Sequence, residues 1–525
     1  MDKKLLSGSL LFVIILAGIF FFLLSEIQKE AGGSFVYVID DPYIHLTLAK
    51  NIAQNQSFGM YGGQFASASS SPLWTLFLSV CYNFFPEFVL VPAILNFTFS
   101  LLLTLLVYIF LAKKGTGHIL SLAFALLIYL AAPCPALIYT GMEHVLHILL
   151  VAMIFLMLTA EKYKSRVDIL FLCLLSLAAT GIRYETAFLV FFLSIFLAYN
   201  KNILAGALVL ISGAAVPVIF GLYSLSKGWF FFPLSIYLKA DLQSFSIIYF
   251  IKKFILQWYI QLSENPSLLI ILLVISIILY GTFKNDLIPR HHKGILLIYL
   301  FSSILHLQFA STGWFYRYEA YLITSGLLLI FLNYKPLLNL NFNFLKNLKK
   351  TGALLLILAI FLAPFIHRAG SSLIRIPKAA NKIFAFDYSA ARFLSKYFPG
   401  KVAAINDIGA ISYYNSAQYI DLVGLSSLDV AELKRNGNFN TKSIGELLNR
   451  KDCELAIIYP NWFVDSNRLP GNFRKVAEWN YLGDYAVAEG TLAFYTSDEK
   501  LADSLVSAMI DYERKIADII KLDIK

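Results

Sequence analysis

The sequence contains few charged residues. Asp, Glu, Lys and Arg make up 14% of its 525 residues, whereas a soluble protein contains roughly 25%. Hydrophobic residues make up 58%, and they gather in runs that are long enough, or nearly long enough, to cross a bilayer. This composition excludes an ordinary soluble globular protein and indicates a polytopic membrane protein.

Cysteine is also scarce. The chain has four cysteines, and no two of them form a C-x-x-C pair or a metal-ligand spacing. Cys81, Cys134 and Cys173 lie in or beside apolar runs, and Cys453 is alone in the polar C-terminal region. We therefore expect no disulfide framework. The sequence also shows no internal repeat and no low-complexity linker.

Eleven apolar segments are predicted to be membrane-spanning helices. The first follows Lys3 and Lys4 and lacks a small-residue cleavage site, so we interpret it as a retained helix rather than a signal peptide. The predicted helices are 5–24, 88–112, 118–132, 143–160, 167–181, 186–199, 203–222, 267–283, 294–309, 320–333 and 352–366.

The loops between these helices differ in charge from one side to the other. If the N-terminus is cytoplasmic, the inner loops, such as 161–166 and 333–350, are basic, as inner loops usually are. The net charge of +10 is then explained without a nucleic-acid partner. The opposite loops mix acids, arginines and aromatic residues. An odd number of spans also puts the C-terminal region outside the membrane.

The composition changes after residue 366. We expect residues 1–366 to form the membrane part, with a first external loop over 25–87, and residues 367–525 to form an extracytoplasmic α/β domain. Segments 387–397 and 500–523 have helical spacing. Short buried strands are predicted at 401–407, 418–424, 454–460, 473–480, 485–490 and 491–496. The fold class is thus a polytopic α-helical membrane protein with a C-terminal α/β domain.

Two adjacent carboxylates, Asp40 and Asp41, follow the first apolar run. In one interpretation they cap a helix that begins near Pro42, since acids and proline both favour a helix N-terminus. In the other, one of them is a general base beside the membrane, which takes a proton from an attacking hydroxyl. The sequence by itself leaves both interpretations open.

The other outer loops carry cations and acids at helix junctions. Each has an ordinary explanation as a snorkelling side chain, an aromatic-belt residue or an acid at a helix N-terminus. Together they supply acids for proton transfer and cations for a phosphate. A metal site at His144 and His147 lacks a third ligand fixed by spacing. The charged residues of these loops are Glu143, Arg183, Glu185, Lys239, Arg317 and Glu319.

The ordered set of motifs resembles the GT-C superfamily of polyprenyl-phosphate-sugar-dependent glycosyltransferases, and within it the branch of terminal arabinofuranosyltransferases. The resemblance covers most of the chain, and its most distinctive part is the tail segment Asn406–Tyr414, followed by Tyr419–Leu425. The chain differs from the family pattern at Thr47 and Leu234. The remaining matching segments are 40–44, 49–52, Gly59, 70–74, 141–143, 183–185, 233–239 and 317–318.

The resemblance implies an inverting transfer of a sugar from a polyprenyl-phosphate donor to a cell-envelope glycan or glycolipid acceptor. The site would lie on the outer face of a bacterial cytoplasmic membrane. Asp40 is the predicted base, and Asp41 orients the acceptor or holds a divalent cation, which would be the only cofactor. Lys239, Arg183 and Arg317 are expected to bind the leaving phosphate and to share a cavity with Asp40. Substrate positioning is assigned to Tyr43, His45, Glu143, Glu185 and Tyr318, and acceptor binding to Asp407 and Tyr413.

Two other classes of protein remain. A transporter or lipid flippase should carry charged residues inside its helices, along a path through the bilayer, whereas here they gather at one side. A non-enzymatic scaffold would leave the clustered acids and cations without a role. The sequence names neither the donor sugar nor the acceptor.

Overall fold

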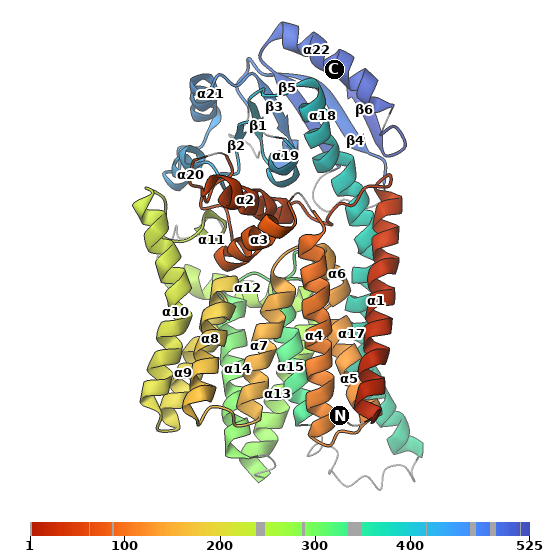
Figure 1. The fold of residues 1–525 in the computed structure, drawn as a ribbon, viewed down its shortest axis with the longest axis vertical. Helices are drawn as coiled ribbons and strands as arrows, with labels where there is room; N and C mark the ends of the chain where they lie inside the picture. The colour runs from red at the N-terminus through yellow and green to blue at the C-terminus, as the bar shows by residue number, and fades with distance from the viewer. Residues whose placement is uncertain are drawn as a thin grey trace. The chain divides into compact units, whose positions relative to one another are not determined.

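The computed structural model describes residues 3–61, 63–86, 89–237, 247–285, 289–333, 348–415, 417–462, 469–483, 490–514 and 516–525. The chain divides into two compact units, which are considered separately (Figure 1). The helical unit consists of Met1–Phe22, Ala93–Ile219 and Leu242–Ile374. The mixed unit consists of Leu23–Pro92, Phe220–Asp241 and Arg375–Lys525.

The helical unit is built from apolar helices. Among the described residues, five helices are long and apolar enough to cross a membrane, and four shorter ones are also apolar. Each predicted span coincides with a helix, so the polytopic fold is confirmed. These helices are α1 (Lys3–Glu30), α4 (Val91–Lys113), α5 (His118–Ala131), α7 (His144–Thr159), α8 (Arg166–Ile182), α9 (Thr186–Tyr199), α10 (Ile203–Ser226), α13 (Pro266–Asn285), α14 (Arg290–Phe309), α15 (Ala320–Leu332) and α17 (Leu348–Ile383).

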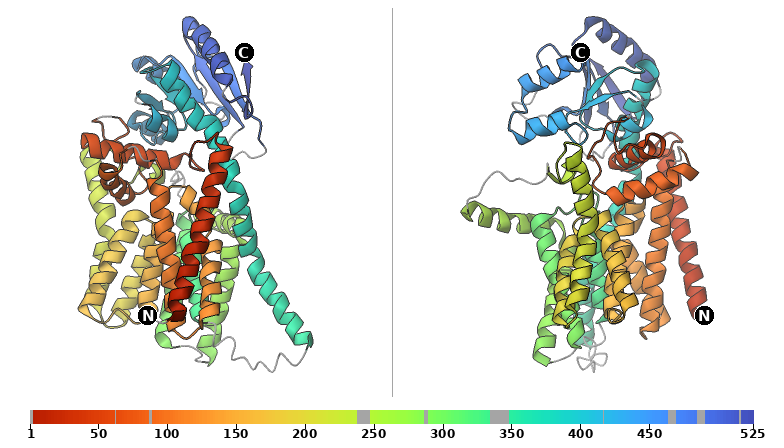
Figure 2. Two further views of the ribbon diagram at one scale, coloured as in Figure 1. Left: turned by 45° about the vertical axis from the view of Figure 1, so that its right-hand side comes forward. Right: turned by 60° about the vertical axis from the view of Figure 1, so that its left-hand side comes forward.

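Two helices of this unit were not expected from the sequence. The short α6 (Cys134–Tyr139) precedes α7, and α12 (Ile247–Glu264) follows the predicted seventh span. Helix α12 runs across the direction of the upright helices (Figure 2, right). Its sequence alternates apolar residues with Lys, Gln and Glu, so it is amphipathic and does not form an uninterrupted apolar run.

The mixed unit contains the first loop. Helices α2 (Asp41–Asn55) and α3 (Pro72–Phe84) come from this loop, and α11 (Leu234–Tyr237) comes from the segment after α10. Helix α17 continues past the break expected at residue 366 as far as Ile383. It leads through a π-helical turn, η2 (Phe384–Tyr388), into α18 (Ser389–Tyr397).

A six-stranded sheet forms the centre of the tail. Its order is β2-β1-β3-β5-β4-β6. Strand β1 is parallel to both of its neighbours, β2 and β3. The pairs β3–β5, β5–β4 and β4–β6 are antiparallel. The strands are β1 (Ala403–Ile405), β2 (Tyr419–Asp421), β3 (Leu455–Ile458), β4 (Arg474–Tyr481), β5 (Thr491–Thr496) and β6 (Ile520–Ile524). The connecting helices are α19 (Gly409–Tyr414), α20 (Leu428–Arg435), α21 (Thr441–Arg450) and η3 (Pro460–Trp462).

Alternate strand residues pack into two different cores, as the two-residue period of a strand requires. Leu455 and Ile457 join the core that includes Leu394 of α18 and the helix α22 (Glu499–Glu513). Ala456 and Ile458 join the opposite core with α20 and α21. The sheet is therefore covered by helices on both faces.

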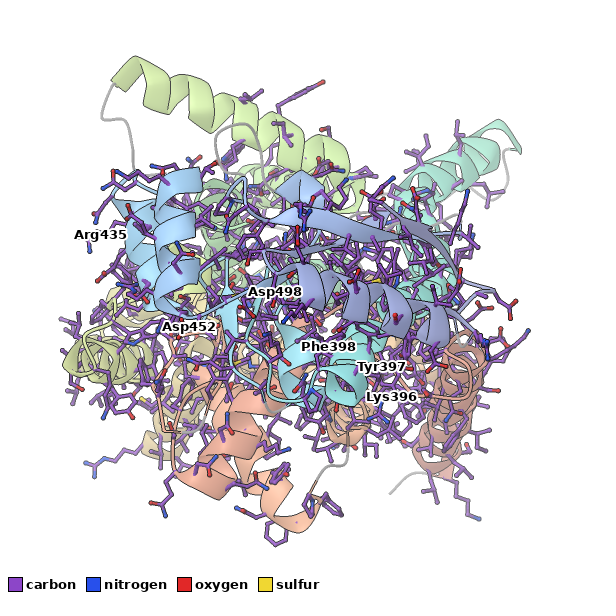
Figure 3. All side chains as sticks on the ribbon, turned by 90° about the horizontal axis from the view of Figure 1, so that it is seen from above. Lys396, Tyr397, Phe398, Arg435, Asp452 and Asp498 are labelled. Carbon is purple, nitrogen blue, oxygen red and sulfur yellow. The ribbon has the colours of Figure 1, made fainter. Side chains whose placement is uncertain are left out.

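The end of α18 is also tied to α22. The Tyr397 hydroxyl donates a hydrogen bond to Asp511, and Lys396 lies 3.4 Å from the same carboxylate. Lys396, Tyr397 and Phe398 lie together at this end of the helix (Figure 3).

One predicted helix in the tail is too long. The helix expected at 500–523 ends at Glu513, and residues 520–524 form strand β6 beside β4. The alternation of Ile520, Leu522 and Ile524 was the available signal for a strand. The predicted strand at 485–490 lies almost entirely outside the described residues. The other predicted strands overlap β1, β2, β3, β4 and β5.

Candidate functional site

The carboxylate of Asp40 is a buried anchor between two distant parts of the mixed unit. Asp40 occupies the N-cap position of α2, but its side chain makes no capping bond to that helix. It instead accepts hydrogen bonds from the backbone N–H groups of Gly409 and of Ala410, the latter at 2.7 Å, at the start of α19. The side chain of Asp407 is also hydrogen-bonded to it. Asp40 therefore caps a helix that lies far along the chain.

Three carboxyl groups share this part of the unit. Burial raises the pKa of Asp40, although Asp407 and the two amides act in the opposite direction. Burial and the charges of Asp40 and Asp387 raise the pKa of Asp407 well above its usual range. Asp407 therefore holds its proton to a higher pH than an exposed carboxyl group does, and in its hydrogen bond with Asp40 it is the favoured donor. Burial and the charge of Asp40 raise the pKa of Asp387 to about 7.

Neutral groups and one cation hold Asp387 in place. The Tyr459 hydroxyl donates to Asp387 Oδ1 at 2.8 Å. The side-chain amide of Asn406 exchanges two 2.9 Å hydrogen bonds with the backbone of Tyr459. Lys382 is buried, with Nζ 5.3 Å from the centre of the Tyr459 ring. The positive charge of Lys382 favours the ionised form of Asp387. It offsets the effect of burial only in part, so the pKa of Asp387 stays raised.

These groups gather where the parallel strands end. Asn406 and Asp407 follow β1, Asp421 ends β2 and Tyr459 follows β3. The Asp421 carboxylate accepts backbone N–H groups from Val423, at 2.8 Å, and from two further residues of the turn. Asp421 therefore shapes the turn, and the groups after β1 and β3 surround Asp40.

Aromatic residues predicted to position substrates lie beside this acid cluster. The buried Tyr43 ring is 5.8 Å from Tyr413 and 5.6 Å from Tyr414. Its hydroxyl accepts the N–H of Tyr37 at 3.1 Å. His45 is buried 2.8 Å from the Thr75 hydroxyl, so it joins α2 to α3. The mixed unit thus brings together Asp40, Asp41, Tyr43, Asp407 and Tyr413.

The helical unit holds the predicted arginines in a second cluster. Arg183 Nη1 lies 3.0 Å from Glu143 Oε1, and the same guanidinium pairs with Glu185 through two further bonds. The two glutamates therefore position Arg183 and balance much of its charge.

Tyr318 joins the two arginines. The Arg183 guanidinium lies 5.5 Å, and that of Arg317 5.0 Å, from the centre of the Tyr318 ring. Arg317 Nη2 also donates to the Tyr318 hydroxyl at 3.1 Å. Arg317 is buried, with only 4% of its surface exposed.

A left-handed turn precedes Arg317. Trp314, Phe315 and Tyr316 have φ values of 43°, 62° and 64°, and Gly313 has 81°. Such backbone costs about 1–2 kcal/mol per residue that carries a Cβ. The turn is closed by a 3.2 Å bond from Arg317 N–H to the Gly313 carbonyl. It fixes the direction in which Arg317 leaves the backbone.

Arg368 of α17 holds this turn, and we did not predict this role from the sequence. Its Nη2 donates to the Tyr316 carbonyl at 2.8 Å, and Nη1 lies 2.6 Å from Glu319 Oε1. Glu319 Oε2 accepts the Gly313 N–H at 2.7 Å. Arg368 and Glu319 are both buried. The available signal was an arginine within a helix that is otherwise apolar for several turns.

Parts of the site prediction remain untested. Lys239 lies outside the described residues. Arg183 and Arg317 belong to one compact unit and Asp40 to the other, so the cavity expected among them stays a prediction. Within the described ranges no group of three or more His, Cys, Asp or Glu residues could hold a metal ion. Asp41 as a metal ligand thus gains no support.

Comparisons with known proteins address the fold. A family model described as a domain of unknown function (DUF8728) matches residues 379–497. The comparison with curated proteins gave no match. The crystal structure of ArnT from Cupriavidus metallidurans bound to undecaprenyl phosphate superposes with a TM-score of 0.50 at 13% identity. The match covers 94% of this chain and 98% of that chain. The likeness shows that this chain shares the fold of ArnT, in agreement with the expected polytopic α-helical protein with a C-terminal α/β domain, and it does not confirm the arabinofuranosyltransferase branch.

The Asp40 anchor predicts a strict requirement for glycine at position 409. A Cβ at Gly409 would overlap both the backbone oxygen and the carboxylate of Asp40. We expect Gly409→Ala to lower the free energy of unfolding by about 1–3 kcal/mol, as overpacking does. Gly471→Ala is the matched control, since its Cβ meets nothing within 4 Å. Equal thermal stability of the two variants in detergent would contradict the anchor.

Asp387 predicts a pH-dependent stability. Its pKa rises from about 4 in an unfolded chain to about 7 in the fold, so between these values the folded protein holds a proton that the unfolded chain has lost. Stability should therefore fall as pH rises from about 4 to 7 and level off above. Between pH 4 and 7, the thermal stability of Asp387→Asn should decline less with rising pH than that of the wild type. The exposed Asp503→Asn should retain the wild-type slope, and an unchanged slope in Asp387→Asn would refute the assignment.

Arg368 and Glu319 should behave as one unit. Removing either partner of a buried ion pair costs about 3–5 kcal/mol, so Arg368→Ala and Glu319→Ala should each lower stability strongly. The double variant should lose less than the sum of the two. Arg290→Ala, which removes a surface bond to Tyr199, is the control. Strictly additive losses would show that the two residues act separately.

Proposed function

We propose that this protein is an inverting glycosyltransferase that uses a polyprenyl-phosphate sugar as donor. The acceptor is a glycan or glycolipid of the cell envelope. The observation that carries this proposal is the likeness to ArnT bound to undecaprenyl phosphate over nearly the whole of both chains. The two polar clusters add the chemical groups that the reaction needs.

The arginine cluster supplies the phosphate side of the reaction. A polyprenyl phosphate leaves with negative charge, which fixed cations stabilise. Two glutamates position Arg183, and we assign the main contact with the phosphate to Arg317. Its approach to the Tyr318 ring and hydroxyl fixes the guanidinium plane, which suits bidentate binding of phosphate oxygens. Lys239 keeps its predicted role in binding the phosphate.

The first loop, which carries Asp40 and Asp41, supplies the base, and we favour Asp41 for this role. The Asp40 carboxylate is buried and is hydrogen-bonded to two backbone N–H groups and to the Asp407 side chain, so most of its acceptor sites are already used. Asp41 begins α2 and is only partly buried. The sequence predicted Asp40 as the base; on this geometry we propose instead that Asp41 takes the proton and that Asp40 positions the loop.

The proposed step balances as a single displacement. Asp41 removes the proton of an acceptor hydroxyl, and the oxygen attacks the anomeric carbon of the donor. The bond between that carbon and the phosphate oxygen breaks as the new glycosidic bond forms. Polyprenyl phosphate leaves as an anion without needing a proton, and the anomeric centre is inverted.

The location follows from the same proposal. An odd number of spans and a cytoplasmic N-terminus would put the tail domain outside a bacterial cytoplasmic membrane. We keep the terminal arabinofuranosyltransferase branch as a proposal on the motifs at 40–44 and 406–425. The donor sugar, whether a pentose or a hexose, is to be identified by the assay.

Binding and turnover test the proposal directly. The purified chain in nanodiscs should bind undecaprenyl phosphate, and Arg317→Ala should weaken the binding by at least ten-fold. A panel of undecaprenyl-phosphate pentoses and hexoses, incubated with an envelope glycolipid extract, should yield free undecaprenyl phosphate. A chain that neither binds undecaprenyl phosphate nor releases it from any donor is not this transferase. Lipid movement across vesicles without sugar transfer would identify the flippase alternative.

Substitutions of Asp40 and Asp41 should have different effects on turnover and on thermal stability. Asp41→Asn should lower turnover by about 10²–10⁴-fold, the usual loss for a general base, and leave thermal stability unchanged. Asp40→Asn should lower thermal stability, because it disturbs the hydrogen bonds that cap α19. The base returns to Asp40 if Asp41→Asn turns over at the wild-type rate while a folded Asp40→Asn is inactive.

A further inference from the structure

Two cavities lie in the mixed unit, at opposite ends of the parallel strands. A cavity of about 320 Å³ is lined by Asn406, Leu422, Val423, Lys434, Phe439 and Trp462, together with Gly437. Asn406 follows β1 and Leu422 follows β2, so this cavity lies at the carboxyl ends of the strands. The second, of about 390 Å³, includes Val402 and Gln418, which precede the same strands.

The topology of the sheet favours the first cavity as a ligand site. In open α/β sheets, ligands bind outside the carboxyl ends of parallel strands, where neighbouring connections leave in opposite directions. β1 lies between β2 and β3 and is parallel to both, so such a point exists beside β1. The volume also falls within the range of small-molecule pockets. We call this space the strand-end cavity.

Trp462 gives the strand-end cavity a flat aromatic surface. Its ring stacks on Tyr459 at 5.3 Å and 27°, so one face of the indole is covered. The residue is nevertheless 38% exposed, which leaves the other face available. Tyr459 is fixed in turn by its bond to Asp387. A rigid ring with one open face is the surface on which the C–H groups of a sugar ring stack.

Lys434 gives the same cavity a partly buried cation. Its Nζ donates to the Val423 carbonyl at 2.8 Å and lies 4.8 Å from the centre of the Phe439 ring. Burial lowers the pKa of Lys434, and Asp421 counters this only in part. An ammonium has three donors, so an anionic ligand oxygen would offset its lost hydration. Its neighbour Arg435 is exposed instead and lies at the outer edge of the tail (Figure 3).

We propose that the strand-end cavity binds an anionic saccharide. The sugar ring stacks on Trp462, its acidic group pairs with Lys434, and a hydroxyl lies near Asn406. The cavity binds this class of ligand whether or not the chain is a transferase. Its role as the subsite that holds the acceptor glycan rests on the proposed function.

Saturation-transfer NMR on the full chain in nanodiscs tests the proposal with two probes. Galacturonate and galactose share the ring and differ in the carboxylate. Galacturonate should bind about ten-fold more tightly, the effect expected for a charged hydrogen bond. Lys434→Met should remove that preference, and Trp462→Ala should weaken both sugars. Lys442→Met, on an exposed lysine of α21, should bind as the wild type does.

The outcomes separate this proposal from the function proposed above. Undecaprenyl phosphate binding, measured on the same samples, should be unchanged in Lys434→Met and Trp462→Ala, which also shows that these variants fold. The cavity assignment is wrong if neither sugar binds, if galactose binds as well as galacturonate, or if Lys434→Met keeps the preference. If the wild-type chain binds galacturonate but does not bind undecaprenyl phosphate, only the proposed role of the saccharide as acceptor is removed.

Discussion

The hydrogen bonds from Gly409 and Ala410 to the Asp40 carboxylate unite residues that are 369 and 370 positions apart in the chain. A buried carboxylate is costly unless donors surround it. Here the N-terminal amides of α19 and the side chain of Asp407 form hydrogen bonds with it. Because α19 follows β1 directly, the cap also brings the first loop to the ends of the parallel strands. This contact therefore joins the first loop to the tail within the mixed unit.

The same contact explains why acids crowd at one place. Once Asp40 is ionised and buried, its charge opposes ionisation of Asp387 and Asp407, whose pKa values rise. Asp387, with a pKa of about 7, is partly protonated near neutral pH, and Asp407 holds its proton to a higher pH than an exposed carboxyl group does. Asp41, which is partly buried at the start of α2, then remains as the more accessible carboxylate of the pair.

Length and apolar periodicity predicted the helices well, because a bilayer selects for both. Alternation likewise predicted most strands. Three features could not be predicted from one sequence. The partners of Asp40 come from a distant segment, Arg368 acts through the carbonyl of Tyr316, and residues 314–316 adopt a backbone that their side chains disfavour. Each depends on tertiary contacts rather than on local pattern.

The left-handed turn shows why such contacts accumulate around charged groups. Three residues with a Cβ in that conformation cost together about 3–6 kcal/mol, and strain of this kind persists only where the surroundings compel it. Arg368 and Glu319 do so by bonding to both ends of the turn. The result is a buried Arg317 with a fixed direction beside Tyr318. In the mixed unit the buried charge of Asp40 is held by backbone N–H groups, and in the helical unit the buried charge of Arg368 is held by the Tyr316 carbonyl and the Glu319 carboxylate. The proposed function assigns the contacts with the ligand to the neighbouring charges, Asp41 and Arg317.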